Sequence, residues 1–342
     1  MTPLPPPERG PGVVQRAAAG GLPGTGPDAT SMPGLPGQAA GEALTARPSS
    51  LWRDTLRSVL RQRSAQVGLV LIGLLFSVAL LADFIAPFDP NQVLIGVEVG
   101  ATKRAASCIH LLGCATDQPE HLFGLDGNLR DEFSRVLHGS RVSLQIGFLT
   151  VGFAILIGSF IGAIAGFAGG MSDNVLMRFM DVLLAFPSLI LAIAIVTFLG
   201  SGLINAQLAI GIVAIPIYAR VARASVLSVR EQDYVTAARA LGESPAGILR
   251  RRILPNALTP LVVQGTLGIA VAILDVAALS FLGLGAQPPL AEWGSMIGLE
   301  RNQVFTAPHL LLAPGIAIVV TVLAFNLLGD GLRDALDPRL NR

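Results

Sequence analysis

Lysine is nearly absent from this chain of 342 residues, in which Lys103 is the single example. A phosphate-binding P-loop needs the pattern G-x-x-x-x-G-K-[ST], in which glycine precedes the lysine and serine or threonine follows it. Lys103 is preceded by Thr102 and followed by Arg104. The chain therefore carries no Walker A site, and we expect any ATP to be bound by partner subunits.

Charged residues of both signs are also scarce, at 14% of the chain, whereas 52% of the residues are hydrophobic. The mean hydropathy of +0.63 lies well above that of soluble globular domains. These values indicate an integral membrane protein. The net charge of +1 gives no indication of a nucleic-acid partner.

Residues 1–50 differ from the rest because they are rich in proline, glycine and alanine and contain no apolar run. This composition predicts a disordered tail. The tail lacks the basic start, apolar stretch and small-residue cleavage site of a signal peptide. We therefore expect the first membrane span to remain as an anchor.

Several later segments have the roughly 20 apolar residues that a helix needs to cross a bilayer core about 30 Å thick. The pattern predicts an all-α polytopic membrane protein with six transmembrane helices. Their expected ranges are Gln66–Ile85, Val142–Phe167, Val182–Leu199, Leu203–Ala222, Leu261–Leu282 and Leu310–Leu328.

The arginines orient these spans, because short cytoplasmic loops are enriched in basic residues. They form three groups, which are Arg53, Arg57, Arg61 and Arg63, then Arg220 to Arg252, and finally Arg333, Arg339 and Arg342. With six spans all three groups fall on one side, so both termini are expected in the cytoplasm. The sequence then divides into the tail (1–50), a first span with an acidic outer segment (51–141), a core (142–332) and a cytoplasmic end (333–342).

Glycine recurs at every fourth position near the second span, at Gly158, Gly162, Gly166 and Gly170. This spacing leaves one helix face almost without side chains, so another helix can approach closely. Two interpretations remain open, which are tight packing within the bundle and a sliding surface used during transport. Pro187, Pro216 and Pro314 lie inside other spans and predict kinks.

The longest polar passage of the second half is 232-QDYVTAARALGESPAGILRRRILPN-256. Gly242 stands where a helix ends in the left-handed conformation, and Ser244 followed by Pro245 is typical of a helix start. We expect a second helix over about Pro245–Leu254, limited by Pro255, with Ala246, Leu249 and Ile253 on one face. From these residues alone, a solvated loop or a helix that binds lipid headgroups would also fit.

The passage resembles the cytoplasmic EAA loop of permease subunits of ATP-binding-cassette importers. The matching positions are Ala237, Ala238, Gly242, Leu254 and Pro255, and Thr236 stands at the position of the motif's glutamate. In that family the loop forms a coupling helix that docks into a groove of the ATPase subunit. The resemblance thus assigns docking contacts to this loop, over about 230–258, with Ala246 and Leu249 facing the groove.

The resemblance extends over about Trp52 to Leu340 and is greatest to the second permease subunit of importers for dipeptides, oligopeptides or nickel. It is carried by 177-MRFMDVLLAFPSLILA-192, 279-LSFLGLGAQPP-289, 292-EWGSMI-297 and 323-LAFNLLGDGLRDALDPRL-340. The outer stretch 124-GLDGNLRDEFSR-135 is similar to the family pattern G-T-D-x-x-G-R-D-x-x-S-R, with Leu125 and Leu129 in place of its threonine and second glycine.

Membership would imply a type I importer bundle in the cell membrane that catalyses no covalent chemistry. It would also imply a homologous permease subunit, two cytoplasmic ATPase subunits and an extracytoplasmic solute-binding protein as partners. ATP would be bound by the ATPases, and the permease would form the translocation pathway.

Two other classes of function would require different features in the sequence. An ion-driven secondary transporter would show internal repeats and unwound, ionisable midmembrane helices, and the sequence has no evident repeat. A membrane enzyme would need a motif such as H-E-x-x-H or G-x-S-x-G. Neither occurs, and the four histidines, His110, His121, His138 and His309, are expected on or near the outer side.

Asp275 is an acidic residue deep within the fifth expected span. Such residues are costly in a membrane and face a bundle interior or a watery cavity. Asp275 is therefore either a structural hydrogen-bond anchor or a contact in the substrate pathway.

The only two cysteines, Cys108 and Cys114, lie together in the outer segment. An extracytoplasmic location favours a disulfide. A zinc site completed by His110 and His121 is an alternative, although the spacing does not match the usual zinc patterns, and no metal is expected. Unpaired thiols are the third reading.

Overall fold

The computed structural model describes residues 59–115 and 118–336. The tail over 1–50 and most of the cytoplasmic end predicted over 333–342 lie outside these ranges. Within them the chain is helical, and the two isolated β-bridges, between Cys108 and His121 and between Leu125 and Asp131, belong to the outer segment.

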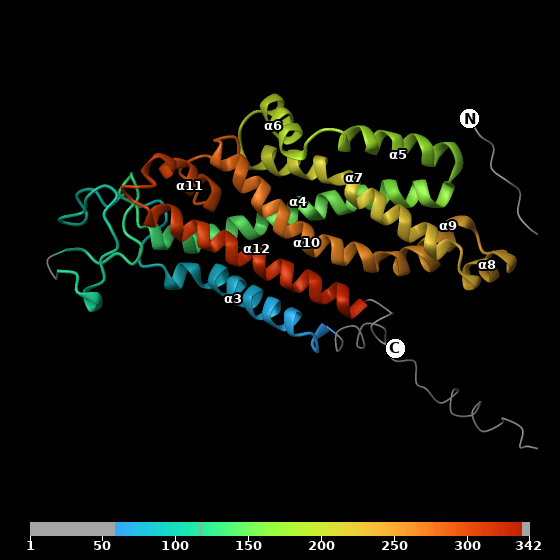
Figure 1. Ribbon diagram of the computed structural model, residues 1–342, viewed down its shortest axis with the longest axis horizontal. Helices are drawn as coiled ribbons and strands as arrows, with labels where there is room; N and C mark the ends of the chain where they lie inside the picture. The colour runs from blue at the N-terminus through green and yellow to red at the C-terminus, as the bar shows by residue number, and fades with distance from the viewer. Residues whose placement is uncertain (1–58, 116–117, 337–342) are drawn as a thin grey trace, which may run out of the picture. The chain divides into compact units, whose positions relative to one another are not determined.

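Five helices of the described residues are long and apolar enough to cross a membrane: α3 (Arg63–Ile85), α4 (Glu132–Ala168), α7 (Leu203–Arg230), α10 (Leu254–Phe281, extended at its start to Pro245) and α12 (His309–Leu336). They lie side by side in a bundle (Figure 1). The predicted all-α polytopic fold is confirmed, with five such helices or six crossings if one bent pair counts as a span.

That bent pair, α5 (Gly170–Leu184) and α6 (Ser188–Leu199), corrects the third expected span. A continuous span from Val182 to Leu199 is wrong, because the two helices meet at an angle of 91°. Proline disfavours the helical conformation of the residue before it, and Pro187 itself has ψ 126° before α6 starts. The proline therefore breaks the helix rather than kinking it. Pro216 and Pro314, in contrast, lie inside the unbroken helices α7 and α12.

The pair α5 and α6 returns the chain toward the end of the bundle at which α4 began (Figure 1). Helix α7 then runs back to the other end of the bundle. That end carries the short helices α8 (Asp233–Ala240) and α9 (Pro245–Ile248), together with the start of α3 and the end of α12. Arg63, Arg230, Arg252 and Arg333 belong to these parts of the chain. Five other described arginines lie in the outer segment, in the first turns of α4 or just after α11 (Trp293–Glu300): Arg104, Arg130, Arg135, Arg141 and Arg301. The described arginines are therefore not confined to one end, and the orientation expected from the positive-inside pattern stays a prediction.

Helices α4 and α7 cross closely at three glycines of the predicted series. A Cβ atom built on Gly158 would lie 2.8 Å from the Ile215 oxygen, and one on Gly166 would lie 3.0 Å from the Arg223 oxygen. One on Gly162 would meet the Ala219 oxygen at still shorter range. Only glycine allows the two backbones to approach in this way.

Gly170 is not part of this contact face. Helix α4 ends at Ala168, and Gly169 and Gly170 have φ values of 67° and 59° as the chain turns into α5. A Cβ atom on Gly170 would meet nothing within 4 Å. The spacing of four therefore continues into a turn, where it no longer defines a helix face.

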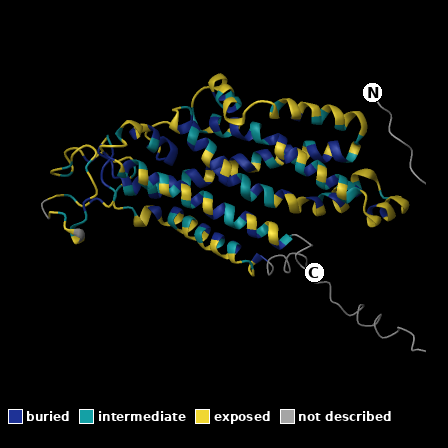
Figure 2. Ribbon diagram, viewed as in Figure 1, coloured by how far each residue is buried: buried dark blue, intermediate teal, exposed yellow. Residues whose placement is uncertain are grey.

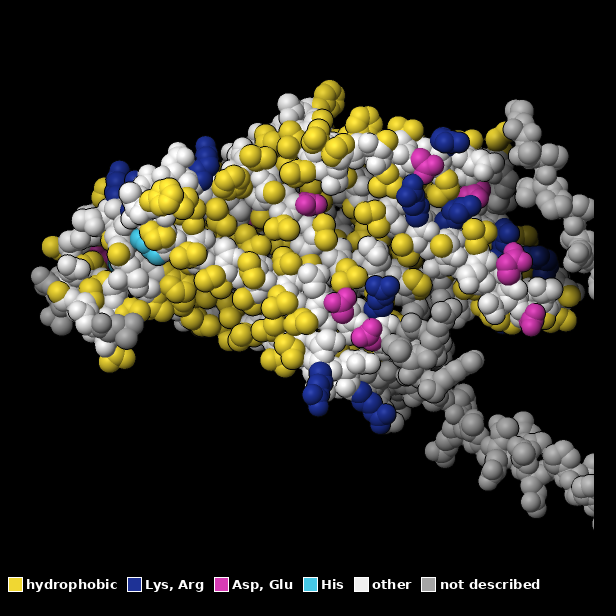
Figure 3. All heavy atoms as spheres, in the orientation of Figure 1, with side chains coloured by type: hydrophobic (Ala, Val, Ile, Leu, Met, Phe, Trp, Pro, Cys, Tyr) yellow, Lys and Arg dark blue, Asp and Glu magenta, His cyan; other side chains and the backbone are white. Residues whose placement is uncertain are grey.

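The main core lies where α4, α7 and α10 meet, and the outer faces of the helices remain exposed (Figure 2). Large apolar side chains such as Leu156, Phe160, Phe198 and Val319 are exposed on these faces. Figure 3 shows a largely hydrophobic middle, with most of the acidic and basic side chains of this face toward the end that carries α8 and α9 and a few basic ones at the opposite end. This is the surface of a protein whose surrounding solvent is lipid.

The opposite end is closed by α11 (Trp293–Glu300), which packs beside the first turns of α4. The Trp293 indole N–H donates to the Val136 oxygen at 3.0 Å. The side chain of Glu292 caps α11 by accepting from the backbone N–H groups of Gly294 and Ser295. Burial raises the pKa of Glu292, against the lowering effect of these two hydrogen bonds.

Candidate functional site

The turn between α8 and α9 is built by its local sequence. Gly242 has φ 81°, the Glu243 N–H donates to the Ala238 oxygen, and the Gly242 N–H donates to the Arg239 oxygen. This pair of bonds is the Schellman arrangement that ends a helix at glycine. The Ser244 side chain then accepts from the Gly247 N–H at 3.2 Å, with Pro245 at the first helical position. Two short helices therefore meet at a sharply defined turn.

An apolar cluster holds this turn against the ends of α4 and α7. Its buried members are Ala163, Val226, Val235, Ala238, Ile248, Ile253 and Ala257. Polar contacts add to it, since the Asn256 amide donates to the Tyr234 hydroxyl at 3.2 Å and Arg252 pairs with Glu243 at 3.2 Å. The loop is thus fixed to the bundle and cannot be read as a freely solvated connection.

The predicted loop residues divide into an inner and an outer set. Ala238 is buried, Leu249 and Leu254 are half-buried, and the rest are exposed, which are Thr236, Ala237, Gly242, Ala246 and Pro255. The prediction that Ala246, Leu249 and Ile253 share one outward face is wrong, because Ile253 is fully buried and Leu249 packs on the same cluster. The outward apolar residue that sequence reasoning missed is Leu241, which is 88% exposed at the turn.

Pro255 does not limit the second helix. A π-helical turn over Leu249–Ile253 joins α9 to α10, and the Leu254 N–H donates to the Leu249 oxygen five residues earlier. Such a turn accommodates an extra residue inside a helix, and Pro255 follows it in the first turn of α10, where its missing N–H is tolerated. The chain from Pro245 to Phe281 is therefore one continuous rod of 37 residues.

A second candidate site lies within the bundle, in a cavity of about 190 Å³ between α4, α5, α6, α7 and α10. Its walls are mostly apolar, as at Val151, Ile210 and Ala272. Asp275 lines this cavity and is half-buried. Thr150, Tyr218 and Gln264, which sequence reasoning missed, line it as well. Their signal in the sequence was only that each is a polar residue in an apolar helix.

Arginine and aspartate pair between α5 and α7 toward the end of the bundle that carries α8 and α9. Arg220 approaches Asp181 to 2.6 Å, and Arg223 forms two hydrogen bonds with Asp173. Arg178 lines the same surface hollow. The pair of Arg220 with Asp181 is exposed, and exposed pairs contribute about 0–1 kcal/mol. The pair of Arg223 with Asp173 is partly buried, and both pairs help to set how α5 lies against α7.

The outer segment is held by a buried ionic network that starts at α4. Asp131 caps that helix by accepting from the Ser134 N–H at 2.7 Å, and its other oxygen lies 2.9 Å from His121 Nδ1. Glu98 lies 3.1 Å from the Nε2 atom of the same ring. Burial lowers the pKa of His121, but the hydrogen bonds and charges of Asp131 and Glu98 outweigh it and raise that pKa above its ordinary value.

The stretch 124-GLDGNLRDEFSR-135 forms the rest of this network. Asp126 pairs with Arg130 at 2.7 Å, and the Arg135 guanidinium donates to the Pro90 oxygen at 2.8 Å. Leu129 adopts φ 56°, a left-handed conformation that side chains other than glycine rarely take. It is buried beside Leu94 and Leu125. Leucine therefore packs a small core at a position where the related pattern has glycine.

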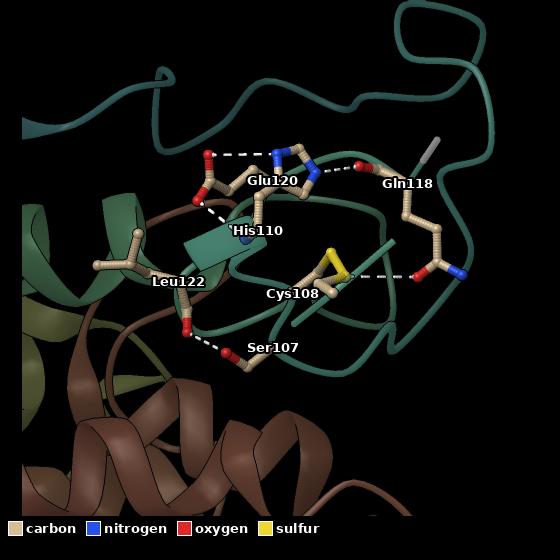
Figure 4. Close-up of a disulfide and its surroundings, with 7 residues drawn as sticks. Ser107, Cys108, His110, Gln118, Glu120 and Leu122 are labelled. Atoms are coloured by element: carbon tan, nitrogen blue, oxygen red, sulfur yellow. Dashed lines mark hydrogen bonds and ion pairs between the residues drawn. A yellow bond between two sulfur atoms is a disulfide. The ribbon is translucent and has the colours of Figure 1, made fainter. Parts of the chain in front are cut away.

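A disulfide joins Cys108 and Cys114, whose Cα atoms lie 5.4 Å apart (Figure 4). A ring nitrogen of His110 forms a hydrogen bond with the Gln118 backbone oxygen at 2.8 Å, and the ring lies near Glu120. Both ring nitrogens of His121 have hydrogen-bond partners, which are Asp131 and Glu98. No cluster of metal-ligating side chains occurs in the described part of the chain. The four residues considered for zinc therefore do not form a ligand set.

The chain matches known protein families over two separate ranges. Residues 158–342 match the family described as binding-protein-dependent transport system inner membrane component. Residues 50–98 match the N-terminal transmembrane domain of oligopeptide transport permease C. The chain belongs to the family of binding-protein-dependent transport system inner membrane components. The resemblance seen in the sequence is thus confirmed, and the chain is a permease subunit of an ABC importer.

Curated relatives cover most of the permease. It is 42% identical over 296 residues to the dipeptide transport system permease protein of Alkalihalophilus pseudofirmus, a match that covers 85% of this chain and 91% of that protein. It is 41% identical to the glutathione transport system permease protein of Pectobacterium atrosepticum, covering 84% and 91%. It is 42% identical to the di/tripeptide transport system permease protein of Pseudomonas aeruginosa, covering 86% and 93%.

A solved structure supports the fold of the permease. An inward-facing structure of the MetNI methionine ABC transporter matches with a TM-score of 0.50 and 20% identity, covering 59% of this chain and 97% of that one. At this identity the likeness concerns the fold alone. The alternative of an ion-driven secondary transporter finds no support in any of these matches.

Proposed function

We propose that this permease imports peptides across the cell inner membrane, with both of its ends in the cytoplasm. The relatives of about 42% identity are named for dipeptides and for di- and tripeptides. The partners we propose are a homologous permease subunit, two cytoplasmic ATPase subunits that bind the ATP, and an extracytoplasmic solute-binding protein. The chain itself then performs no covalent chemistry and holds no cofactor.

The observation that carries the coupling role is the exposed turn at Gly242. Leu241 and Ala246 project from a turn whose inner side is fixed to α4 and α7 by the buried cluster. Exposed apolar side chains on a turn that is fixed to the bundle are suited to docking into a protein groove, because little conformational freedom is lost on binding. In this proposal the ATPase groove receives Leu241 and Ala246, and Leu249 serves as support.

The substitution Ala246→Glu tests the docking. Ala246 is exposed, so the substitution leaves the fold intact, but an unpaired carboxylate buried in the groove costs about 3 kcal/mol, or more than a hundredfold in affinity. We expect loss of ATPase co-purification and of ATP-driven peptide uptake in proteoliposomes. Val99→Glu is the matched control, since Val99 is exposed on the outer segment. Normal ATPase recruitment by the Ala246→Glu variant contradicts the proposal.

A further inference from the structure

The cavity between α7 and α10 contains polar side chains without partners. Asp275, Gln264 and the Tyr218 hydroxyl all line it, and within the described residues none of them makes a hydrogen bond or ion pair. Asp173 and Asp181, by contrast, each pair with an arginine. Polar groups within a bundle are normally satisfied. Asp275 and Gln264 are half-buried and face the cavity without a partner, so the set can receive a ligand that enters the cavity.

Thr150 supports this reading most directly. A threonine within a helix usually donates its hydroxyl to the carbonyl four residues earlier, as Thr197, Thr266 and Thr321 do at 2.8, 3.0 and 2.7 Å. Thr150 is 1% exposed, lines the cavity and has no hydrogen-bond partner for its Oγ1 atom. Its hydroxyl is thus an unsatisfied polar atom in the wall of the cavity.

The charge of the set defines the chemistry of that molecule. Among the residues that the structure describes, Asp275 is the one carboxylate of the cavity wall and no basic residue lines the same cavity. A carboxylate within a membrane-spanning helix is stabilised by a cation. Hydroxyl and amide groups beside it, from Thr150, Tyr218 and Gln264, suit a neighbouring peptide group, because they both donate and accept hydrogen bonds.

We propose that Asp275 binds the α-ammonium group of the transported peptide inside the membrane, while Thr150, Tyr218 and Gln264 bind the first peptide group. This inference rests on the proposed import of peptides and adds a subsite within the permease itself. A cavity of about 190 Å³ equals the liquid volume of about six water molecules. This volume accommodates one small residue. The subsite therefore binds the amino terminus and does not contact the remainder of the peptide.

The test uses a reporter thiol beside the carboxylate. Val271 lines the cavity, is 56% exposed and lies one helical turn before Asp275. Both native cysteines are joined in the disulfide, so Val271→Cys introduces the single free thiol of this chain. The permease with its partner permease and ATPases is placed in lipid nanodiscs without binding protein. Labelling of this chain by a cationic and by an anionic methanethiosulfonate is followed by mass spectrometry.

We expect the cationic reagent to be favoured, and Asp275→Asn to reduce that preference about tenfold. A dipeptide with a free amino terminus is expected to slow labelling only when Asp275 is present. The same dipeptide with an acetylated amino terminus is expected to give no protection. Leu274→Cys is the control, because Leu274 is exposed but does not line the cavity, and its labelling should be insensitive to both changes.

Three results overturn the inference: a reagent preference unchanged by Asp275→Asn, equal protection by the acetylated peptide, or loss of the partner permease from the Asp275→Asn assembly. The last result would assign Asp275 to a subunit contact. The proposed function is checked separately by ATP-driven dipeptide uptake of the unsubstituted transporter with its binding protein. If that uptake is intact while labelling ignores Asp275, only the subsite is wrong.

Discussion

Gly162 of α4 lies so close to Ala219 of α7 that a Cβ atom on the glycine would collide with the alanine's carbonyl oxygen. The same Cβ atom on Gly162 would lie only 2.7 Å from the Cβ atom of Ala222. Both neighbours belong to a helix held by the main core, so they have little room to move. The two helices are thus joined by backbone contact.

Gly162→Leu should therefore destabilise the permease by about 1–3 kcal/mol or more, as overpacking of a core does. Unfolding in detergent, followed by intrinsic fluorescence, measures the effect. Gly152→Leu is the matched control, since Gly152 is exposed on the same helix and a Cβ atom there meets nothing within 4 Å. Equal stability of the two variants would show that α4 and α7 separate easily.

At Leu129 the glycine variant should be more stable than the alanine variant, which is the reverse of the usual order of stability. Either change removes buried leucine packing at about 2–5 kcal/mol, but alanine keeps the left-handed strain of φ 56° and glycine relieves about 1 kcal/mol of it. We expect stability to fall from wild type to Leu129→Gly and further to Leu129→Ala. Thermal unfolding measures the series.

Leu125 provides the control for this inversion. It is fully buried in the same small core and is not among the residues with positive φ. There Leu125→Ala should be more stable than Leu125→Gly, because glycine loses more backbone entropy on folding. The same order at both positions would contradict a strained Leu129.

The contact of His121 with Asp131 and Glu98 predicts a dependence of stability on pH. The pKa of His121 is raised in the folded protein, so its stabilising effect is fully present below the unfolded value of about 6.5. The effect is lost as the pH rises through the folded pKa. We expect the unfolding temperature to fall across this window, and His121→Gln to flatten the fall. A slope that persists in the variant would place the titration elsewhere.

Alkylation tests the bond between Cys108 and Cys114. Without reduction we expect no label on this chain, and after reduction we expect two, because the chain has two cysteines. Loss of so small a ring should cost about 2 kcal/mol. Labelling before reduction would show free thiols, and metal analysis of the same sample would reveal any zinc.

Length and hydropathy were sufficient to predict the five long helices, because a membrane imposes both on any segment that crosses it. The break at Pro187 was not predictable in this way. A proline in an apolar run either kinks a helix or ends it, and neighbouring helices decide between the two outcomes. Pro216 and Pro314 lie inside unbroken helices, whereas Pro187 stands at a break between two helices.

The turn between α8 and α9 was predictable in its local chemistry, since Gly242, Ser244 and Pro245 each have one strongly preferred role. Its orientation was not. Helical spacing groups Ala246 with Ile253, but which of them meets the bundle depends on Val226 and Ala163, which lie far away in sequence. The same holds for the cavity, where Thr150, Tyr218 and Asp275 come from three different helices.

The continuous helix from Pro245 to Phe281 has a mechanical consequence. Ala246 and Asp275 are 29 positions apart on it, which corresponds to about 44 Å at about 1.5 Å per residue. A rod of this length that pivots by about 10° at one end carries the other end through about 8 Å. A small swing of the turn between α8 and α9 is therefore geometrically sufficient to open or close the space around a single carboxylate inside the membrane, near the other end of the rod.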